Sequence, residues 1–141
     1  MYVADNTFFA VPSAEGQAAA FRYIAAVLRP GGRFALEAFV PAEGAPAGAT
    51  VELRSLAAER VVLSVHRADL DRQIAEGSFV ELSETGGVRL RPWSIRYTTP
   101  DQLDAMARSA GFRCESRHAG WDGAAFTESS AHHVSTYRLP A

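Results

Sequence analysis

The sequence predicts an α/β fold interrupted by an antiparallel β-sheet, and three observations predict it. Apolar residues recur at helical spacing between two apolar runs, as in a strand-helix-strand unit. Residues 50–97 carry short runs with strand character, two of them joined by a glycine turn. A capped helix and two further alternating runs close the chain. Its 141 residues are 48% hydrophobic, which is enough for one domain, 1–141, with its own core.

The strand-helix-strand unit occupies residues 1–40. Residues 2–4 end an apolar run, and Ser13 is a good N-cap for the helix that follows. Pro30-Gly31-Gly32 ends this helix, because proline cannot continue the hydrogen-bond ladder and glycine tolerates positive φ. Residues 33–40 carry Glu37 as their one charge after Arg33, which predicts a strand covered on both faces in a parallel sheet.

A loop at residues 41–48 leads into the predicted inserted sheet. Its strands are expected at residues 51–54, 60–66, 79–82 and 88–97. Gly86-Gly87 between the last two predicts a hairpin. The apolar positions change parity at Pro92, which predicts a bulge or bend there.

The last part of the chain, residues 98–141, predicts a helix and a hairpin. Thr99, Pro100 and Gln102 together form a capping box with proline at the first helical position. Gly111 ends the helix. Residues 112–118 and 132–138 then alternate as a pair of antiparallel strands.

Composition excludes several classes of protein. The formal net charge of -2 gives no reason to expect a nucleic acid or an anionic membrane as partner. A single cysteine excludes an internal disulfide and a cysteine metal site. There is neither a long apolar span nor a secretory leader. A cytoplasmic protein is expected.

Two motifs, in this order of elements, resemble a known family. Leu28-Arg29-Pro30-Gly31-Gly32 precedes the buried strand, and Ala110-Gly111-Phe112 precedes the terminal hairpin. With the inserted sheet between them, the chain resembles the C-terminal half of the class I S-adenosylmethionine-dependent methyltransferases. The resemblance implies a partial Rossmann-like fold, with S-adenosylmethionine as cofactor. It also implies methylation of a nitrogen or oxygen of a small-molecule acceptor.

The resemblance also implies where the sites lie. Asn6 and Thr7 follow the strand whose end faces the cofactor in this family, and ligands gather at the carboxyl ends of parallel strands. Trp93, Arg96 and Tyr97 lie in the inserted sheet, which roofs the acceptor site in related enzymes. Aromatic walls with a few polar groups are typical of small-molecule sites.

One part of the family pattern is missing from the sequence. The family holds the cofactor with a Gly-x-Gly loop, and no Gly-x-Gly occurs here. The chain alone is therefore expected to have weak or no activity. Because half a sheet leaves an open edge and apolar surface, a homodimer, a swapped assembly or a separate chain supplying the missing half is expected.

Two further residues are candidates by their chemistry. Glu37 within an apolar run should meet either an amine acceptor or an arginine, because a buried carboxylate needs a partner. His133 is the histidine best placed to act as a base in an acceptor pocket. His132 and His133 are neighbours on a strand and point to opposite faces, so no metal site is expected.

Two other functions remain open from the sequence. The chain could be a noncatalytic subunit that dimerises or scaffolds a methyltransferase, with an apolar edge at residues 2–9 buried against another chain. Alternatively, it could be a small-molecule-binding or cyclase-like protein, with a cavity near Trp93, Arg96, Tyr97 and His133. Fold analogy does not choose between these functions.

Overall fold

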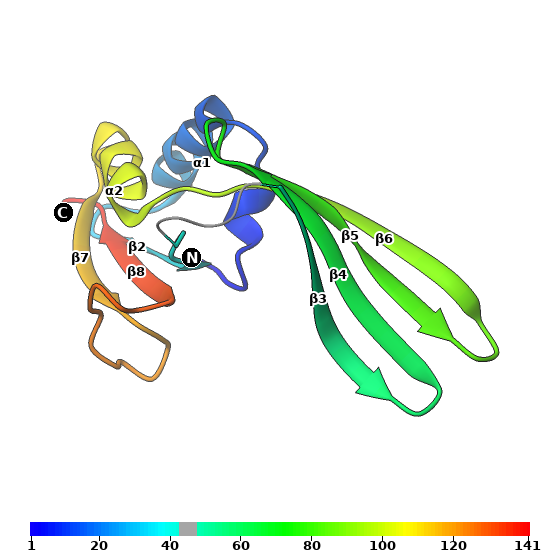
Figure 1. Cartoon of the computed structure of the whole chain (residues 1–141). Helices are drawn as coiled ribbons and strands as arrows, with labels where there is room; N and C mark the ends of the chain where they lie inside the picture. Colours follow the sequence, from blue (N-terminus) through cyan, green and yellow to red (C-terminus); the bar gives the residue numbers. More distant parts are fainter. Residues whose placement is uncertain (43–47) are drawn as a thin grey trace. The chain divides into compact units, whose positions relative to one another are not determined.

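The computed structural model describes residues 1–42 and 48–141, so most of the loop predicted at 41–48 lies outside the described residues. The described chain forms two compact units. One comprises residues 1–42 and 98–141, and the other comprises residues 48–97 (Figure 1). Each contains one four-stranded sheet. The α/β class and the inserted antiparallel sheet are therefore confirmed.

The sheet of the first unit combines a parallel pair with an antiparallel hairpin. Its strand order is β1 (Tyr2–Val3), β2 (Arg33–Phe39), β8 (His132–Arg138) and β7 (Arg113–His118). β1 and β2 run parallel, whereas β8 is antiparallel to both of its neighbours. The carboxyl ends of β1 and β2 and the start of β8 therefore lie at one end of the sheet.

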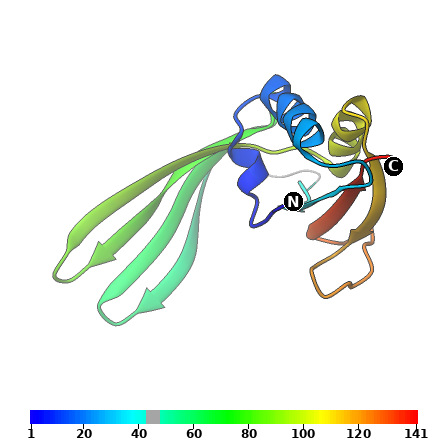
Figure 2. The ribbon, with the colours of Figure 1, turned by 180° about the vertical axis from the view of Figure 1, so that it is seen from behind.

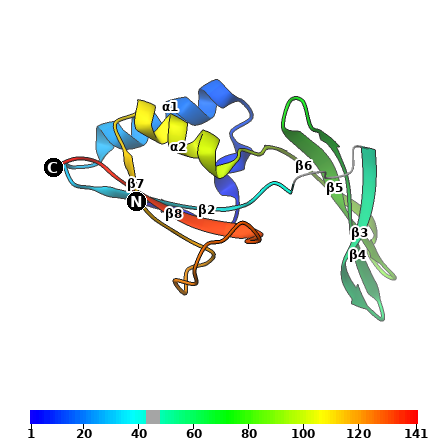
Figure 3. The same cartoon turned by 60° about the vertical axis from the view of Figure 1, so that its left-hand side comes forward.

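Three helices connect these strands. A 3-10 helix, η1 (Thr7–Ala10), precedes α1 (Ala14–Val27), and α2 (Pro100–Ser109) leads into β7. α1 and α2 lie side by side on the same face of the sheet, as Figures 2 and 3 show from two directions. The caps act as predicted: Ser13 accepts the Gly16 N–H, and Gly111 adopts a φ of 90° after α2.

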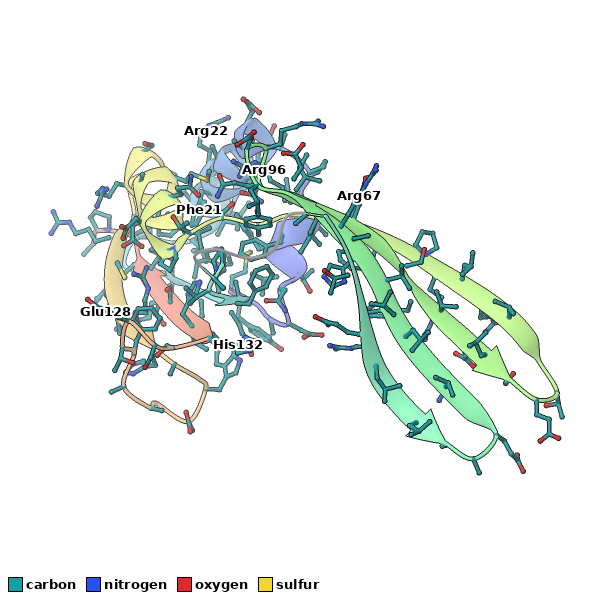
Figure 4. All side chains as sticks on the ribbon, viewed as in Figure 1. Phe21, Arg22, Arg67, Arg96, Glu128 and His132 are labelled. Carbon is teal, nitrogen blue, oxygen red and sulfur yellow. The ribbon has the colours of Figure 1, made fainter. Side chains whose placement is uncertain are left out.

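An aromatic cluster fills the space between the helices and the sheet. Phe21 of α1 is fully buried, and its ring centroid lies 5.3 to 6.1 Å from those of Phe8, Phe34, Phe112 and Tyr137 (Figure 4). These edge-on contacts pack α1 against η1, β2, β8 and the residue that precedes β7. The cluster therefore fixes η1 and α1 on one face of the sheet.

The opposite face of this sheet is only partly covered. Along β2, the helix-facing residues Phe34, Leu36 and Ala38 are buried, whereas Ala35 and Glu37 between them remain partly accessible. The prediction of a strand covered on both faces is therefore wrong for the described residues. Their helices cover one face alone, so the other face is open to additional packing.

The second unit is a meander of four ten-residue strands. β3 (Gly48–Ala57), β4 (Arg60–Asp69), β5 (Ile74–Ser83) and β6 (Gly87–Arg96) pair with their chain neighbours in antiparallel order. The predicted hairpin at Gly86-Gly87 is present, with Gly87 at a φ of 68°. No helix covers either face within residues 48–97.

The predicted bulge at Pro92 is wrong. β5 and β6 keep one register throughout, with Pro92 opposite Ser78 and Trp93 opposite Gly77. The apolar positions change parity because the two ends of β6 place their apolar side chains on opposite faces. Register shifts occur instead between Leu53 and Ser55 in β3 and between Cys114 and Ser116 in β7.

None of the helices in the described ranges is both long and apolar enough to cross a membrane.

The capping box of α2 provides a first prediction. The Thr99 hydroxyl accepts the Gln102 N–H at 3.3 Å, and the Gln102 side chain accepts the Thr99 N–H at 3.0 Å. Thr99→Ala should lower the free energy of unfolding by about 1 kcal/mol, because the Gln102 N–H loses its side-chain acceptor. Urea denaturation measures this change. Thr99→Ser retains the hydroxyl and should restore most of the loss.

Candidate functional site

The carboxyl end of β1 is built around two residues in the left-handed region. Asp5 and Asn6 have φ values of 54° and 59°, a conformation that asparagine and aspartate tolerate better than most residues. The Asn6 side-chain oxygen accepts the Phe39 N–H at 2.7 Å. Asn6 therefore ties the end of β1 to the end of β2. Thr7 follows as the exposed first residue of η1.

Glu37 lies beside this turn on the open face of the sheet. Its Oε2 accepts the Asp5 N–H at 3.0 Å. A hydrogen bond from the Trp121 side chain, together with the Asp5 N–H, lowers the pKa of Glu37 below its ordinary value. Glu37 is therefore ionised at neutral pH. Its partners are an indole and a backbone N–H, instead of the arginine that the sequence left open.

Trp121 and Tyr2 place aromatic surface next to this carboxylate. Their ring centroids are 6.1 Å apart in an edge-on arrangement, and both side chains are more than half exposed. Trp121 comes from the loop between β7 and β8, and Tyr2 from β1. Aromatic rings beside an ionised carboxylate form a surface that attracts a cationic or amine group.

His133 lies at the same end of the sheet but on the face covered by the helices. It pairs with Ala38 of β2 and is fully buried, whereas its neighbour His132 is exposed (Figure 4). The two histidines thus point to opposite faces, as predicted. Nδ1 of His133 lies 2.8 Å from the Ser135 hydroxyl oxygen.

A polar network surrounds His133. Asp104 of α2 accepts hydrogen bonds from Arg117 at 2.6 Å and from the Tyr137 hydroxyl at 2.9 Å. Arg117 Nε also donates to the Ser135 hydroxyl at 2.8 Å. Because Arg117 can only donate, the Ser135 hydroxyl retains its own hydrogen, and His133 Nδ1 is an acceptor within its reach. A hydrogen bond in that direction would leave the proton of the neutral imidazole on Nε2.

In this tautomer His133 is a hydrogen-bond donor. Burial, reinforced by the nearby Arg117 charge, lowers the pKa of His133 from 6.5 to about 4. Nε2 is buried without a hydrogen-bond partner among the described residues. Since Nδ1 is already occupied, the lone pair that a general base needs is not free. The predicted catalytic role of His133 stays a prediction, and the geometry favours donation by Nε2–H over proton abstraction.

The pKa of His133 predicts a pH-dependent stability. Between about pH 6.5 and pH 4 the unfolded chain binds the His133 proton and the folded chain does not, so the free energy of unfolding should fall as the pH falls through this window. Above pH 6.5 this contribution is fully present. Urea denaturation at pH 7 and pH 5 measures the drop. His133→Gln should reduce it far more than His132→Gln at the exposed neighbour, whose charge adds only the smallest contribution to the lowered pKa of His133.

Three of the predicted acceptor residues, Trp93, Arg96 and Tyr97, lie in the second unit, whereas Glu37 lies in the first. Trp93 packs against His66 and Phe79, with ring centroids 5.8 and 6.1 Å away, and its indole Nε1 is buried without a partner among the described residues. Arg96 donates to the Gln73 side chain at 3.3 Å. Burial, with a contribution from Asp69, raises the pKa of Tyr97. Their role in acceptor binding stays a prediction.

Sequence reasoning missed three residues of the site region. Arg117, Asp104 and Ser135 have no spacing pattern that would join them to His133. The register shift in β7 explains part of this, because it turns Arg117 onto the face of Ser135. Across residues 1–42 and 48–141, no group of three or more side chains could hold a metal ion.

Comparison with solved structures places this geometry in a known context. The chain is similar to the CcbJ methyltransferase from Streptomyces caelestis, with 34% identity over 98% of this chain and a TM-score of 0.93. It is also similar to an S-adenosylmethionine-dependent methyltransferase from Clostridium acetobutylicum, with 7% identity over 99% of the chain and a TM-score of 0.83.

A third similar structure is CalS10 from Micromonospora echinaspora, an amino pentose methyltransferase bound to S-adenosylmethionine. The identity is 18% over 97% of this chain, with a TM-score of 0.66. No protein-family model matches the chain, and no curated protein matches it. At 7% and 18% identity the likeness concerns the fold alone. The similarity to CcbJ, at 34% identity, supports the resemblance to the S-adenosylmethionine-dependent methyltransferases that the sequence indicates.

The chain spans little more than half of these relatives. It covers 59% of CcbJ and 57% of each of the other two proteins.

Proposed function

We propose that this chain is the acceptor-side part of an S-adenosylmethionine-dependent methyltransferase that methylates a nitrogen or oxygen of a small molecule. The observation that carries the proposal is the similarity to CcbJ, at 34% identity with a TM-score of 0.93 over 98% of the chain. The parallel pair β1–β2, with η1 and α1 between its strands, supports a partial Rossmann-like arrangement.

The residues present do not by themselves fit the methyl donor. Asn6 and Thr7 lie at the expected strand end, but the Asn6 oxygen is already bonded to the Phe39 N–H. The sequence contains no Gly-x-Gly loop that would let backbone approach the donor closely. We therefore assign donor binding mainly to residues outside this chain, with Asn6 and Thr7 at the edge of that site.

The acceptor side is better represented. Glu37 is an ionised carboxylate on the open sheet face, flanked by Trp121 and Tyr2. Such a group suits an acceptor that carries an amine, by charge and by aromatic contact. A role of Trp93, Arg96 and Tyr97 of the inserted sheet in acceptor binding is proposed separately, from the resemblance to the family. Methyl transfer requires alignment of acceptor and donor above all, so positioning residues are the main contribution expected from this part.

The open surfaces of the first unit support completion by the missing part. β1 pairs on one side only within the described residues, and the helices cover one face of its sheet. Sheet edges and open faces of this kind favour further pairing and packing. We propose that the donor-binding part pairs with the open edge of β1, as a separate chain, as a swapped copy or as an extension of the same polypeptide.

Complementation tests this function. The part of CcbJ that this chain does not cover would be produced as a separate polypeptide and mixed with the full 141-residue chain. Methyl transfer from labelled S-adenosylmethionine to a panel of small amines and alcohols is expected with the mixture and not with either part alone. Glu37→Gln should reduce the rate with amines, while Glu128→Gln, in an exposed loop, should not.

Two outcomes would contradict the proposal. One is a stable complex that binds the donor yet methylates no acceptor of either class, which would favour a noncatalytic subunit. The other is failure of the two parts to associate at all.

A further inference from the structure

A fully buried polar pair lies where the chain returns from the inserted sheet to the first unit. The Thr98 hydroxyl donates to the Gln17 side-chain oxygen at 2.6 Å, and both residues are fully buried. Thr98 belongs to the connection between β6 and α2, and Gln17 lies in α1 (Figure 1). The two residues are 81 positions apart in the sequence. The bond therefore joins two distant parts of the first unit.

Gln17 also binds the segment that precedes its helix. Its side-chain nitrogen donates to the Val11 carbonyl oxygen at 3.2 Å. Val11 follows η1 directly, and its N–H bonds to the Phe8 carbonyl oxygen. A primary amide can make both contacts because it carries donors and an acceptor on one planar group. One side chain thus links the end of η1, α1 and the residue before the N-cap of α2.

The residue before Thr98 is held by the second unit. Tyr97 belongs to that unit, and its N–H donates to the Gln73 carbonyl oxygen at 3.0 Å. The Gln73 side chain accepts a hydrogen bond from Arg96 at 3.3 Å. Gln73 has a φ of 55°, a strained value for a residue with a side chain, and such strain persists only where surrounding contacts impose it. Gln73 therefore holds the end of β6 in place.

The return crossing, which we define as the connection from Tyr97 to Thr98, consequently contains no linker. Tyr97 is bonded within the second unit and Thr98 within the first, so a single peptide bond joins the two units here. The outgoing connection is longer, because the Val40 N–H still bonds to Ala131 of the first unit and β3 begins only at Gly48. Motion between two units concentrates in the few residues that join them. The contacts of Thr98 therefore matter for the inserted sheet.

Stability alone does not account for the buried pair of Gln17 and Thr98. Their hydrogen bond replaces bonds that both groups make to water in the unfolded chain, so its net contribution is small. Two apolar side chains of the same shape would fill the space equally well, because apolar contact has no preferred direction. A hydrogen bond between buried groups is directional and is satisfied in one arrangement only. The pair is therefore suited to fix where Thr98 lies.

We propose that Gln17 is a positioning residue, which anchors the return crossing of the sheet that carries Trp93 and Arg96. Without this anchor, Thr98 can shift and the crossing gains freedom. The part of the inference that concerns the acceptor rests on the proposed function: a less constrained acceptor unit should bind its acceptor more weakly, because binding must then order the unit. The anchoring itself does not depend on methyl transfer and is tested without it.

Amide hydrogen exchange of the full chain, followed by nuclear magnetic resonance, tests the anchoring. The key variant combines Gln17→Met with Thr98→Val. Because it replaces both polar partners by apolar groups of similar shape, the fold should remain stable. In this double variant, the N–H groups of Tyr97 and Thr99 should exchange at least about tenfold faster than in wild type, since the crossing opens locally.

Two controls accompany the double variant. The Val40 N–H, on the outgoing connection, should exchange as in wild type. Arg22→Met, at an exposed position of α1, should leave all these rates unchanged (Figure 4). Unchanged exchange at Tyr97 and Thr99 in the double variant would overturn the inference. Equal acceleration at Val40 would also overturn it, because the pair would then stabilise the unit as a whole without anchoring the crossing.

Kinetics of the complemented methyltransferase test the consequence for the acceptor. The double variant should raise KM for the acceptor at least about fivefold with little change in kcat, as expected when binding is weakened and the chemical step is not. A kcat that falls while KM stays constant would contradict the positioning role. If the complex methylates no acceptor, the proposed function fails, whereas the exchange rates at Tyr97 and Thr99 decide whether Gln17 anchors the crossing.

Discussion

Phe21→Ala is expected to unfold most of the first unit. The Phe21 ring is fully buried and contacts four other aromatic rings from η1, β2, the start of β7 and β8. Removing it leaves a cavity in the centre of this cluster, at a cost of about 3 to 5 kcal/mol. That is a large fraction of the stability of a domain of this size. Urea denaturation followed by circular dichroism measures the loss.

Tyr23→Ala is the matched control for this prediction. Tyr23 lies on the same helix but is 73% exposed, so its loss should change the free energy of unfolding by less than about 0.5 kcal/mol. Equal effects of the two substitutions would mean that α1 does not pack on the sheet as described.

Arg117→Met is expected to have the second largest effect. Arg117 and Asp104 form an ion pair whose side chains are only 16% and 20% exposed. Arg117 also holds the Ser135 hydroxyl and lies over the Phe126 ring. Removing the guanidinium leaves the Asp104 carboxylate with the Tyr137 hydroxyl alone. The cost should be about 3 kcal/mol, at the lower end for pairs that are fully buried.

A nuclear magnetic resonance measurement tests whether Arg117 sets the tautomer of His133 in addition to stabilising the fold. In wild type, ¹⁵N chemical shifts of His133 should report Nε2–H and an unprotonated Nδ1 at neutral pH. In Arg117→Met, the Ser135 hydroxyl is free to rotate, so the two tautomers should mix. Arg113→Met on the same strand, at an exposed position, should change neither the stability nor the tautomer. An unchanged His133 spectrum in Arg117→Met would contradict the assigned network.

Local sequence signals predicted the helices and most strand positions. Ser13, Thr99 and Gly111 act through contacts within a few residues, so their effect is readable from the sequence. The apolar run that became β2 was equally clear. These signals fix where elements begin and end, and the order of elements then led to the parallel pair and the hairpin.

The inserted sheet was predicted less accurately because its register depends on distant strands. β5 begins at Ile74, earlier than expected, and includes Gly77 within the strand. Gly77 interrupts the apolar pattern, but a Cβ there would clash with the Val65 carbonyl oxygen of the neighbouring strand. Close packing of backbones therefore requires the glycine that made the sequence look like a strand end.

The candidate site was only partly predictable, because its contacts also join residues that lie far apart in the sequence. Asn6 was predicted because ligands gather at the carboxyl ends of parallel strands. Glu37 was predicted because it is a charge within an apolar run. The partner of Glu37, Trp121, comes from a loop in the last part of the chain, and the partners of His133 meet through a register shift in β7. Such contacts follow from tertiary structure, which no local pattern encodes.

The central claim is that this chain supplies the acceptor side of a methyltransferase while the donor is held mainly by residues outside it. Isothermal titration calorimetry of the purified 141-residue chain with S-adenosylhomocysteine tests the claim most directly. The account predicts no saturable heat for the chain alone. Micromolar binding by this chain without any other part, lost in Asn6→Ala, would contradict it.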